Sequence, residues 1–327
     1  MDYPNFKKKI DPAFRAQFFD HSAHHMEHHL KKIMDQLTTK YDSYELEFWE
    51  WIAEHVHLMY DLKDALEYLN SNFSAKELLD QFRTARTLGR VLYAGFYTDY
   101  FKGKTGQEIL AENNMDNHKY YEKIKEIIKE IEKYRDEINQ NGKILKTERQ
   151  SMDFYYLELY PALKRNKQLR FYLTANPLHL RDCIFRLLEE LFKVANEDQT
   201  RIDFKFYAGG KGYRRDSIVI YGQKKIKSVI KDLPDNWFLE SHLPFGKKIA
   251  SGRTITKDKG KEINEKVLDS RAENSNGSAL TQILADVLYG TVKHNDKMPE
   301  KPEAQFNIIL DVCYNLFIKR VKIHDGL

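Results

Sequence analysis

The stretch from Arg201 to Gly222, RIDFKFYAGGKGYRRDSIVIYG, decides how the second half of this chain folds. Ile202, Phe204 and Phe206 alternate with more polar neighbours, and this period of two residues is typical of a β-strand with one apolar face. A glycine-rich segment follows, and glycine permits the backbone conformations of a tight turn. The β-branched run Ile218-Val219-Ile220 then predicts a returning strand, so we expect a β-hairpin.

Three cationic side chains gather in this hairpin. Lys205 points away from the apolar face of the first strand, and Arg214 and Arg215 lie at the start of the second. Because the two strands pair, we expect the three charges to meet at one end of the sheet. The alternative interpretation is a solvated basic rim, which is the usual state of surface lysines and arginines.

Composition limits the class of protein. The chain has 327 residues, of which 42% are hydrophobic and 31% are charged, so it can bury a sizeable core and is not a disordered chain. Its 53 basic and 49 acidic residues give a formal net charge of +4. Nucleic-acid binding normally needs a concentrated positive field, and the near balance of charge argues against it.

Two further features concern location. The first residues, MDYPNFKKKIDPAF, contain no apolar segment of a signal peptide, and nowhere do about 18 apolar residues follow one another as in a membrane span. Cys183 and Cys313 lie in apolar helical patterns, as core thiols of a reducing compartment do. We therefore expect a cytoplasmic bacterial protein, or one exported by a secretion system that needs no signal peptide.

Residues 1–141 are predicted to form a helical region, because their apolar residues recur at helical spacing. The expected helices are 14–37, 44–70, 75–100 and 118–140. The first of them contains a histidine cluster at metal-ligand spacing, made of His21, His24, His25, His28 and His29. These histidines lie on more than one helix face and lack the carboxylate support that fixes a metal site, so we expect no functional metal there.

After Gly142 the periodicity changes from helical to alternating. Short strands are expected at 143–147, 154–159 and 169–175. A helix beginning at Pro177 separates the last of these from the hairpin, which gives the order β-α-β-β. Residues 243–276, rich in basic residues and glycine, are expected to form a long loop, and helices at 278–294 and 304–322 follow. The predicted fold is therefore α+β, with a helical region of residues 1–141 and a domain of residues 142–327 that holds a mixed β-sheet with flanking helices.

Eight short motifs occur between residues 92 and 288. They are LYAGFY (92–97), ILAENN (109–114), NGKIL (141–145), LRFYLTANP (169–177), IDFKFYAG (202–209), YRRDSIVIYG (213–222), LPFGKKIASG (243–252) and NGSALTQILADVL (276–288). Their order resembles the HopA family of plant-pathogen type III effectors, which also supplies the lyase component of class V lanthipeptide and thioamitide biosynthesis. One departure is Ser275-Asn276-Gly277, where the family has Ser-Phe-Gly.

The resemblance implies a reaction. The family is similar in turn to bacterial phosphothreonine lyases, which eliminate phosphate from phosphothreonine and leave a dehydroamino acid without a metal or an organic cofactor. The resemblance therefore implies a phosphothreonine-lyase-like fold with Lys205 as the base and Arg214 as the phosphate-binding residue, assisted by Arg215. At the position where effector lyases have a histidine as general acid, this chain has Tyr172, so that either a phenol protonates the leaving phosphate or phosphate departs unaided. The resemblance also allows Arg253 and Arg271 to close over the phosphate.

The residues suit this chemistry on physical grounds. Removing a weakly acidic Cα proton needs a neutral amine, so the pKa of Lys205 would have to fall from about 10.4 toward roughly 7 or 8. Neighbouring arginines would lower that pKa, and Arg214 and Arg215 would bind a phosphate dianion. The expected partners are a phosphorylated peptide or protein and a kinase that supplies the phosphate.

Two other functions remain open at this point. The first is a non-catalytic module that keeps the phosphate site and recruits a phosphopeptide or protein, which the absence of the strand histidine favours. The second is an RNA-binding protein that stacks bases on tyrosines of the hairpin, which the balanced charge disfavours.

Overall fold

The computed structural model describes residues 2–98, 106–141, 143–148, 154–164, 169–209, 212–240, 247–257 and 276–324. The chain divides into two compact units, of which the first is Met1–Ala94 with Lys259–Leu327 and the second is Gly95–Asp258. The predicted α+β class is confirmed, because the first unit is helical and the second holds a β-sheet covered by helices. The boundaries between the units follow Ala94 and Asp258, whereas the sequence pattern predicts a boundary after residue 141.

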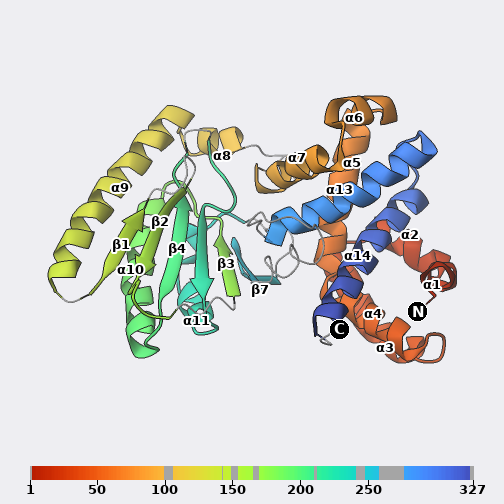
Figure 1. The fold of residues 1–327 in the computed structure, drawn as a ribbon, viewed down its shortest axis with the longest axis horizontal. Coiled ribbons are helices and arrows are strands. Elements are labelled where there is room, and N and C mark those ends of the chain that lie inside the picture. Colours follow the sequence, from red (N-terminus) through yellow and green to blue (C-terminus); the bar gives the residue numbers. More distant parts are fainter. Residues whose placement is uncertain are drawn as a thin grey trace. The chain divides into compact units, whose positions relative to one another are not determined.

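The first unit consists of helices from both sides of the second unit in the sequence (Figure 1). They are α1 (Tyr3–Lys9), α2 (Pro12–Asp20), α3 (Ala23–Leu37), α4 (Ser43–Glu54), α5 (Val56–Asn72), α6 (Ala75–Phe82), the first part of α7 (Ala85–Thr98), α13 (Asn276–Asn295) and α14 (Pro302–His324). α14 packs against α2, α4 and α5. Phe306 of α14 lies between Phe14 and Phe18, with ring centroids 6.2 and 5.4 Å away, so the late helices complete the core of the early ones.

These helices are shorter than the apolar pattern predicts. The expected helix 14–37 is interrupted before α3, where the Ser22 side chain accepts a hydrogen bond from the backbone of His25 and caps a new helix. The expected helix 44–70 is divided at His55, and the expected helix 75–100 is divided at Arg83, which has φ 39°. Because the apolar stripe continues across such a break, the helical periodicity of the sequence does not reveal the break.

The second unit is built on a seven-stranded sheet. Its strands are β1 (Leu145–Glu148), β2 (Phe154–Leu159), β3 (Leu169–Leu173), β4 (Ile202–Tyr207), β5 (Ile218–Gly222), β6 (Lys247–Ala250) and β7 (Arg253–Lys257). Their order is β1-β2-β4-β5-β3-β7-β6, and every described pairing is antiparallel, whereas the sequence led us to expect a mixed sheet. The predicted hairpin is confirmed as β4 and β5, which lie at the centre of the sheet.

Two strands lie where the sequence led us to expect a loop. β6 and β7 fall within residues 243–276, and β7 pairs with β3 from Leu169↔Lys257 to Leu173↔Arg253. Their sequences KKIA and RTITK contain few apolar residues, so alternation does not reveal them.

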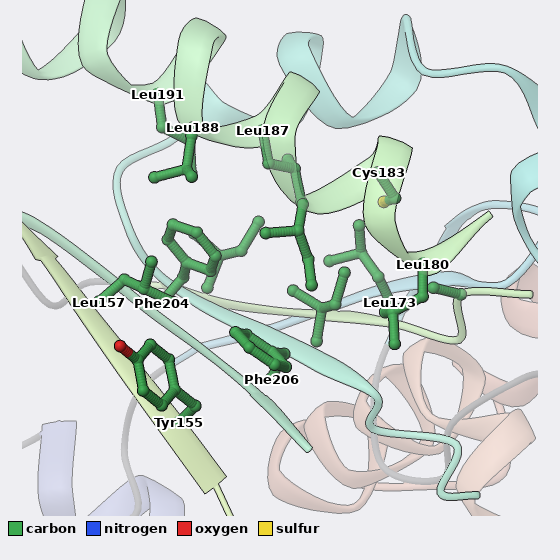
Figure 2. Packing of buried hydrophobic residues seen from close by; sticks show 14 of the residues in the cluster. Tyr155, Leu157, Leu173, Leu180, Cys183, Leu187, Leu188, Leu191, Phe204 and Phe206 are labelled. Carbon is green, nitrogen blue, oxygen red and sulfur yellow. The ribbon is translucent and has the colours of Figure 1, made fainter. Parts of the chain in front are cut away.

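One face of the sheet is covered by helices. α8 (Gly106–Glu112), α9 (Asn117–Gln140), α10 (Leu180–Glu197) and α11 (Ile226–Lys231) belong to the second unit, and a 3-10 turn, η1, spans Asp235–Trp237. Figure 2 shows Leu180, Cys183, Leu187 and Leu191 of α10 facing Leu157, Leu173, Phe204 and Phe206 of the strands. Each fully buried leucine or phenylalanine contributes about 1.5–3 kcal/mol to folding, which makes this layer the main anchor of the hairpin.

The helix α9 joins the same core, although the sequence placed it in the helical region of residues 1–141. Ile124, Ile127 and Ile131 are buried in the cluster that contains the sheet residues. None of the helices in the described ranges combines the length and hydropathy needed to cross a membrane.

Candidate functional site

The register of the strands places the candidate residues on the face of the sheet opposite α10. Tyr156 pairs with Lys205, Lys205 with Val219, and Val219 with Tyr172. Cross-strand partners point to the same side, so these four form one row across β2, β4, β5 and β3. Val219 and Tyr172 are buried but lie outside the apolar cluster that includes α10. We call this side of the sheet the Lys205 face.

Lys205 is enclosed by aromatic residues of β2. Its Nζ lies 4.0 Å from the ring centroid of Phe154 and 3.5 Å from the hydroxyl oxygen of Tyr156. Burial lowers the pKa of this lysine to about 8, and the positive charges of Arg170 and Arg214 lower it too, whereas the carboxylate of Asp216 raises it. A lysine with such a pKa is neutral often enough near pH 7 to accept a proton.

Arg214 lies beside the same ring. Its guanidinium carbon is 5.4 Å from the ring centroids of both Phe154 and Tyr207. Asp216 accepts hydrogen bonds from Nε and Nη2 of Arg214 at 2.8 and 3.1 Å, and it is only 3% exposed. The charge and planar geometry of a guanidinium fixed in this way suit the binding of a phosphate group.

The turn that carries Arg214 is fastened to the rest of the sheet. Ser217 donates a hydrogen bond to the carbonyl of Leu173 and accepts one from the backbone N–H of Ala175, both at 2.8 Å. The hydroxyl of Tyr213 donates to the carbonyl of Ala175 at 3.0 Å. The backbone of Tyr213 also approaches Gly106 so closely that a Cβ there would lie 2.3 Å from its carbonyl oxygen. The position of Arg214 is therefore set by bonds on both sides of it.

The structure brings only some of the six site residues proposed from the sequence together. Lys205, Arg214 and Tyr172 come together on the Lys205 face. Arg215 is buried next to Arg214 in the turn, with 6% of its surface exposed. Arg271 lies outside the described residues.

Arg253 is the residue that the structure does not bring to the site. It pairs with Leu173, whose side chain faces α10, and it is completely buried there. Its Nη1 donates to the carbonyls of Ile230 and Leu233 at 3.1 and 2.8 Å, its Nη2 pairs with Asp235, and its guanidinium lies 4.5 Å from the ring of Phe238. Arg253 thus caps the end of α11 instead of closing over a phosphate.

Four residues of the site were not singled out by the sequence: Phe154, Tyr156, Arg170 and Asp216. Phe154 and Tyr156 alternate along a predicted strand, and Arg170 precedes Tyr172 by two residues, so alternation alone places each pair on one face. The missing information was strand order, because β3 lies next to β5 although α10 and β4 separate them in the sequence.

A charged group continues the Lys205 face beyond the lysine. Arg201 bonds Asp203 at 2.7 Å and Glu158 at 2.7 Å. Asp203 pairs across the sheet with Tyr221, and Tyr221 pairs with Arg170, whose guanidinium lies 5.2 Å from the Tyr221 ring. Charged side chains therefore lie on both sides of Tyr221 on this face.

The histidine cluster lies in the first unit, on α3 and just before it. The rings of His21 and His25 are 4.2 Å apart, and the carboxylate of Glu27 is 2.6 Å from Lys31 and 3.6 Å from His57. Partial loss of hydration and the neighbouring histidines lower the pKa of His25. In the described ranges no three histidine, cysteine or acidic side chains are arranged to hold a metal ion.

Comparison with known proteins gives few matches. No protein-family model and no curated protein matches the chain. Among solved structures, the effector protein from Pseudomonas syringae pv. tomato strain DC3000 is similar with a TM-score of 0.38 and 14% identity, over 77% of this chain and 95% of that one. The effector protein from Pseudomonas syringae pv. syringae strain 61 is similar with a TM-score of 0.40 and 13% identity, over 75% of this chain and 96% of that one.

Proposed function

We propose that the protein is a phosphothreonine or phosphoserine lyase that eliminates phosphate from a phosphorylated peptide. The observation that carries the proposal is Lys205, whose pKa burial and two arginines lower to about 8, on the same face as the guanidinium of Arg214. The eight sequence motifs that resemble the HopA family support the same reaction. A kinase would have to act first, because the substrate carries a phosphate ester.

The proposed reaction uses the two cations differently. The neutral amine of Lys205 takes the Cα proton of the phosphorylated residue, and the electrons of the Cα–H bond form the Cα=Cβ double bond. The Cβ–O bond breaks and its electrons leave with the phosphate. Arg214, with Arg170 nearby, stabilises the negative charge of the leaving group. The products are inorganic phosphate and a dehydroamino acid, and the ammonium of Lys205 then returns its proton to water.

Tyr172 is the proposed general acid. It lies in the same row as Lys205, with Val219 between the two residues. A phosphorylated residue lying over Val219 would therefore have the base on one side and the acid on the other. A phenol can donate a proton to the leaving oxygen, so Tyr172→Phe would slow elimination if phosphate does not leave unaided.

The test is mass spectrometry of a phosphothreonine peptide incubated with the protein, with a thiol added to trap the alkene. We expect loss of the elements of phosphoric acid with the wild-type protein and none with Lys205→Met. Lys146→Met is the matched control, because Lys146 lies on the edge strand of the same sheet with 56% of its side chain exposed. A wild-type protein that leaves several phosphopeptides intact would contradict the proposal.

A phosphopeptide-binding module is the second candidate. The ring of Phe154 lies 4.0 Å from Nζ of Lys205, and the face of an aromatic ring favours the charged ammonium that a binding site would use. Under this alternative the peptide would bind without losing phosphate, and Lys205→Met would reduce only its affinity. Calorimetric titration of the same peptide separates the two functions.

RNA binding is less well supported. Stacking of bases requires accessible aromatic rings, but Tyr207 and Tyr213 of the hairpin are each only 2% exposed. Lack of RNA binding by a filter assay at low salt is the expected result.

A further inference from the structure

A carboxylate connects the two cations of the site. Asp216 is buried and accepts hydrogen bonds from two donors of Arg214, whose side chain is half-buried. The guanidinium of Arg214 and the Nζ of Lys205 lie over one ring, that of Phe154, at 5.4 and 4.0 Å from its centroid. One acidic group, two cations and one aromatic ring therefore form a contiguous group, with Lys205 on β4, Arg214 and Asp216 in the turn between β4 and β5, and Phe154 on β2.

We propose that Asp216 is a positioning residue of this site, which holds the Arg214 guanidinium in the orientation that binds phosphate and screens it from Lys205. The inference rests on the proposed function, because it assigns a role within that site. The inference goes beyond the proposed function because it assigns a role to a carboxylate that touches neither the substrate nor the Cα proton.

The geometry gives the first reason. An arginine side chain has many rotamers, and ordering it on binding costs affinity. The two hydrogen bonds from Asp216 fix the plane of the Arg214 guanidinium before a ligand arrives. Because Ser217, the next residue along the chain, is itself bonded to β3, the carboxylate has a fixed position of its own.

Electrostatics gives the second reason. Two cations beside one ring repel each other, and a buried negative charge offsets that repulsion. Asp216 accordingly raises the pKa of Lys205 while burial, Arg170 and Arg214 lower it. The register places further titratable or charged groups on the Lys205 face. They are Lys146 of β1, Tyr156 and Glu158 of β2, Arg201 just before β4, Asp203 and Tyr207 of β4, Tyr221 of β5, Tyr172 of β3 and Lys248 of β6. Removal of the Asp216 charge should therefore lower the pKa of Lys205 further.

The chain provides a matched control for this role. Arg201 and Asp203 are also two residues apart, and Nε of Arg201 bonds Asp203 at 2.7 Å just as Nε of Arg214 bonds Asp216 at 2.8 Å. Asp203 is 4% exposed and Asp216 is 3% exposed. The two pairs differ in surroundings, since Arg214 lies over the ring of Phe154, which also contacts Lys205.

Two measurements test the inference without relying on turnover. The first is calorimetric binding of a phosphothreonine peptide in a Lys205→Met background, which does not consume the peptide, and there we expect Asp216→Ala to weaken affinity about tenfold and Asp203→Ala less than twofold. The second is an NMR titration of Lys205, assigned by its absence in Lys205→Arg. In Asp216→Asn the pKa of Lys205 should fall by roughly half a unit or more, and in Asp203→Asn it should change less.

Each outcome decides something. Equal effects of the Asp216 and Asp203 variants on affinity and on the lysine titration would overturn the inference, because they would show two equivalent structural ion pairs. An unchanged titration in a folded Asp216→Asn protein would also overturn it. Absence of elimination by the wild-type protein refutes the lyase proposal instead, and the two readouts on Asp216 still decide its role.

Discussion

The buried lysine should make the second unit less stable than it would be with an apolar residue in its place. Lys205 has a pKa of about 8 in the folded protein against 10.5 for an ordinary lysine. At about 1.4 kcal/mol for each pKa unit, this difference corresponds to about 3 kcal/mol of destabilisation at pH 7. The ring of Phe154 and the hydroxyl of Tyr156 recover part of it. We expect Lys205→Met to raise the free energy of unfolding at pH 7 by about 1–3 kcal/mol.

The sign of the pH dependence follows from proton binding. Between pH 8 and 10.5 Lys205 is mostly neutral in the folded chain and mostly charged in the unfolded one. Unfolding therefore takes up a proton, and the free energy of unfolding of the wild-type protein rises with pH in this window. Below pH 8 Lys205 is mostly charged in both the folded and the unfolded chain, and the full cost of burying its charge remains. The advantage of Lys205→Met should consequently shrink by about 2 kcal/mol between pH 7 and pH 10.

Trp237 provides the assay, because it belongs to the second unit whereas Trp49 and Trp51 belong to the first. Urea unfolding is followed by the fluorescence of Trp237 in a background with phenylalanine at the other two positions. Lys146→Met serves as control and should change stability little and equally at both pH values. A Lys205→Met protein that is less stable at pH 7, or an advantage that does not vary with pH, would refute the reasoning.

Three further predictions follow from the same structure. If elimination occurs, its rate should rise about tenfold from pH 6 to 7 and level off above about pH 8. The reason is that about a tenth of Lys205 is neutral at pH 7 when its pKa is about 8. A rate that still climbs steeply at pH 9 would contradict this prediction. Arg253→Met should destabilise the second unit by about 2 kcal/mol or more in urea unfolding, because it leaves the buried carbonyls of Ile230 and Leu233 without their donor, yet the folded protein should keep its phosphopeptide affinity. Leu187→Ala should cost about 2–5 kcal/mol in the same assay, and a loss below about 1 kcal/mol would mean that α10 is not tightly packed.

Local patterns predict local structure well in this chain. The alternation of Ile202, Phe204 and Phe206 predicts β4, and that of the residues at 154–159 predicts β2 with the bounds that the structure has. The physical basis of these patterns is simple, because a strand with one buried face must alternate apolar and polar side chains. The helix breaks at His55 and Arg83 escape such patterns, since the apolar stripe runs through them.

The site could be predicted only in part, because it depends on strand order. Lys205 and Arg214 lie in one hairpin and are close in the sequence, so their proximity was foreseeable. Arg170 reaches them because β3 returns to pair with β5, which the alternation of β3 does not encode. The sequence does not reveal that β7 is a strand, and the pairing of Arg253 with Leu173 turns Arg253 to the other face of the sheet.

The order of the two units along the chain has a consequence for synthesis. The second unit, Gly95–Asp258, leaves the ribosome as one continuous segment and can fold while translation proceeds. The first unit cannot complete the packing around Phe14 and Phe18 until Phe306 has been made, so its early helices expose part of this aromatic surface until then. During that interval the early helices offer a binding surface to chaperones, while the hairpin with Lys205 already has its full sequence.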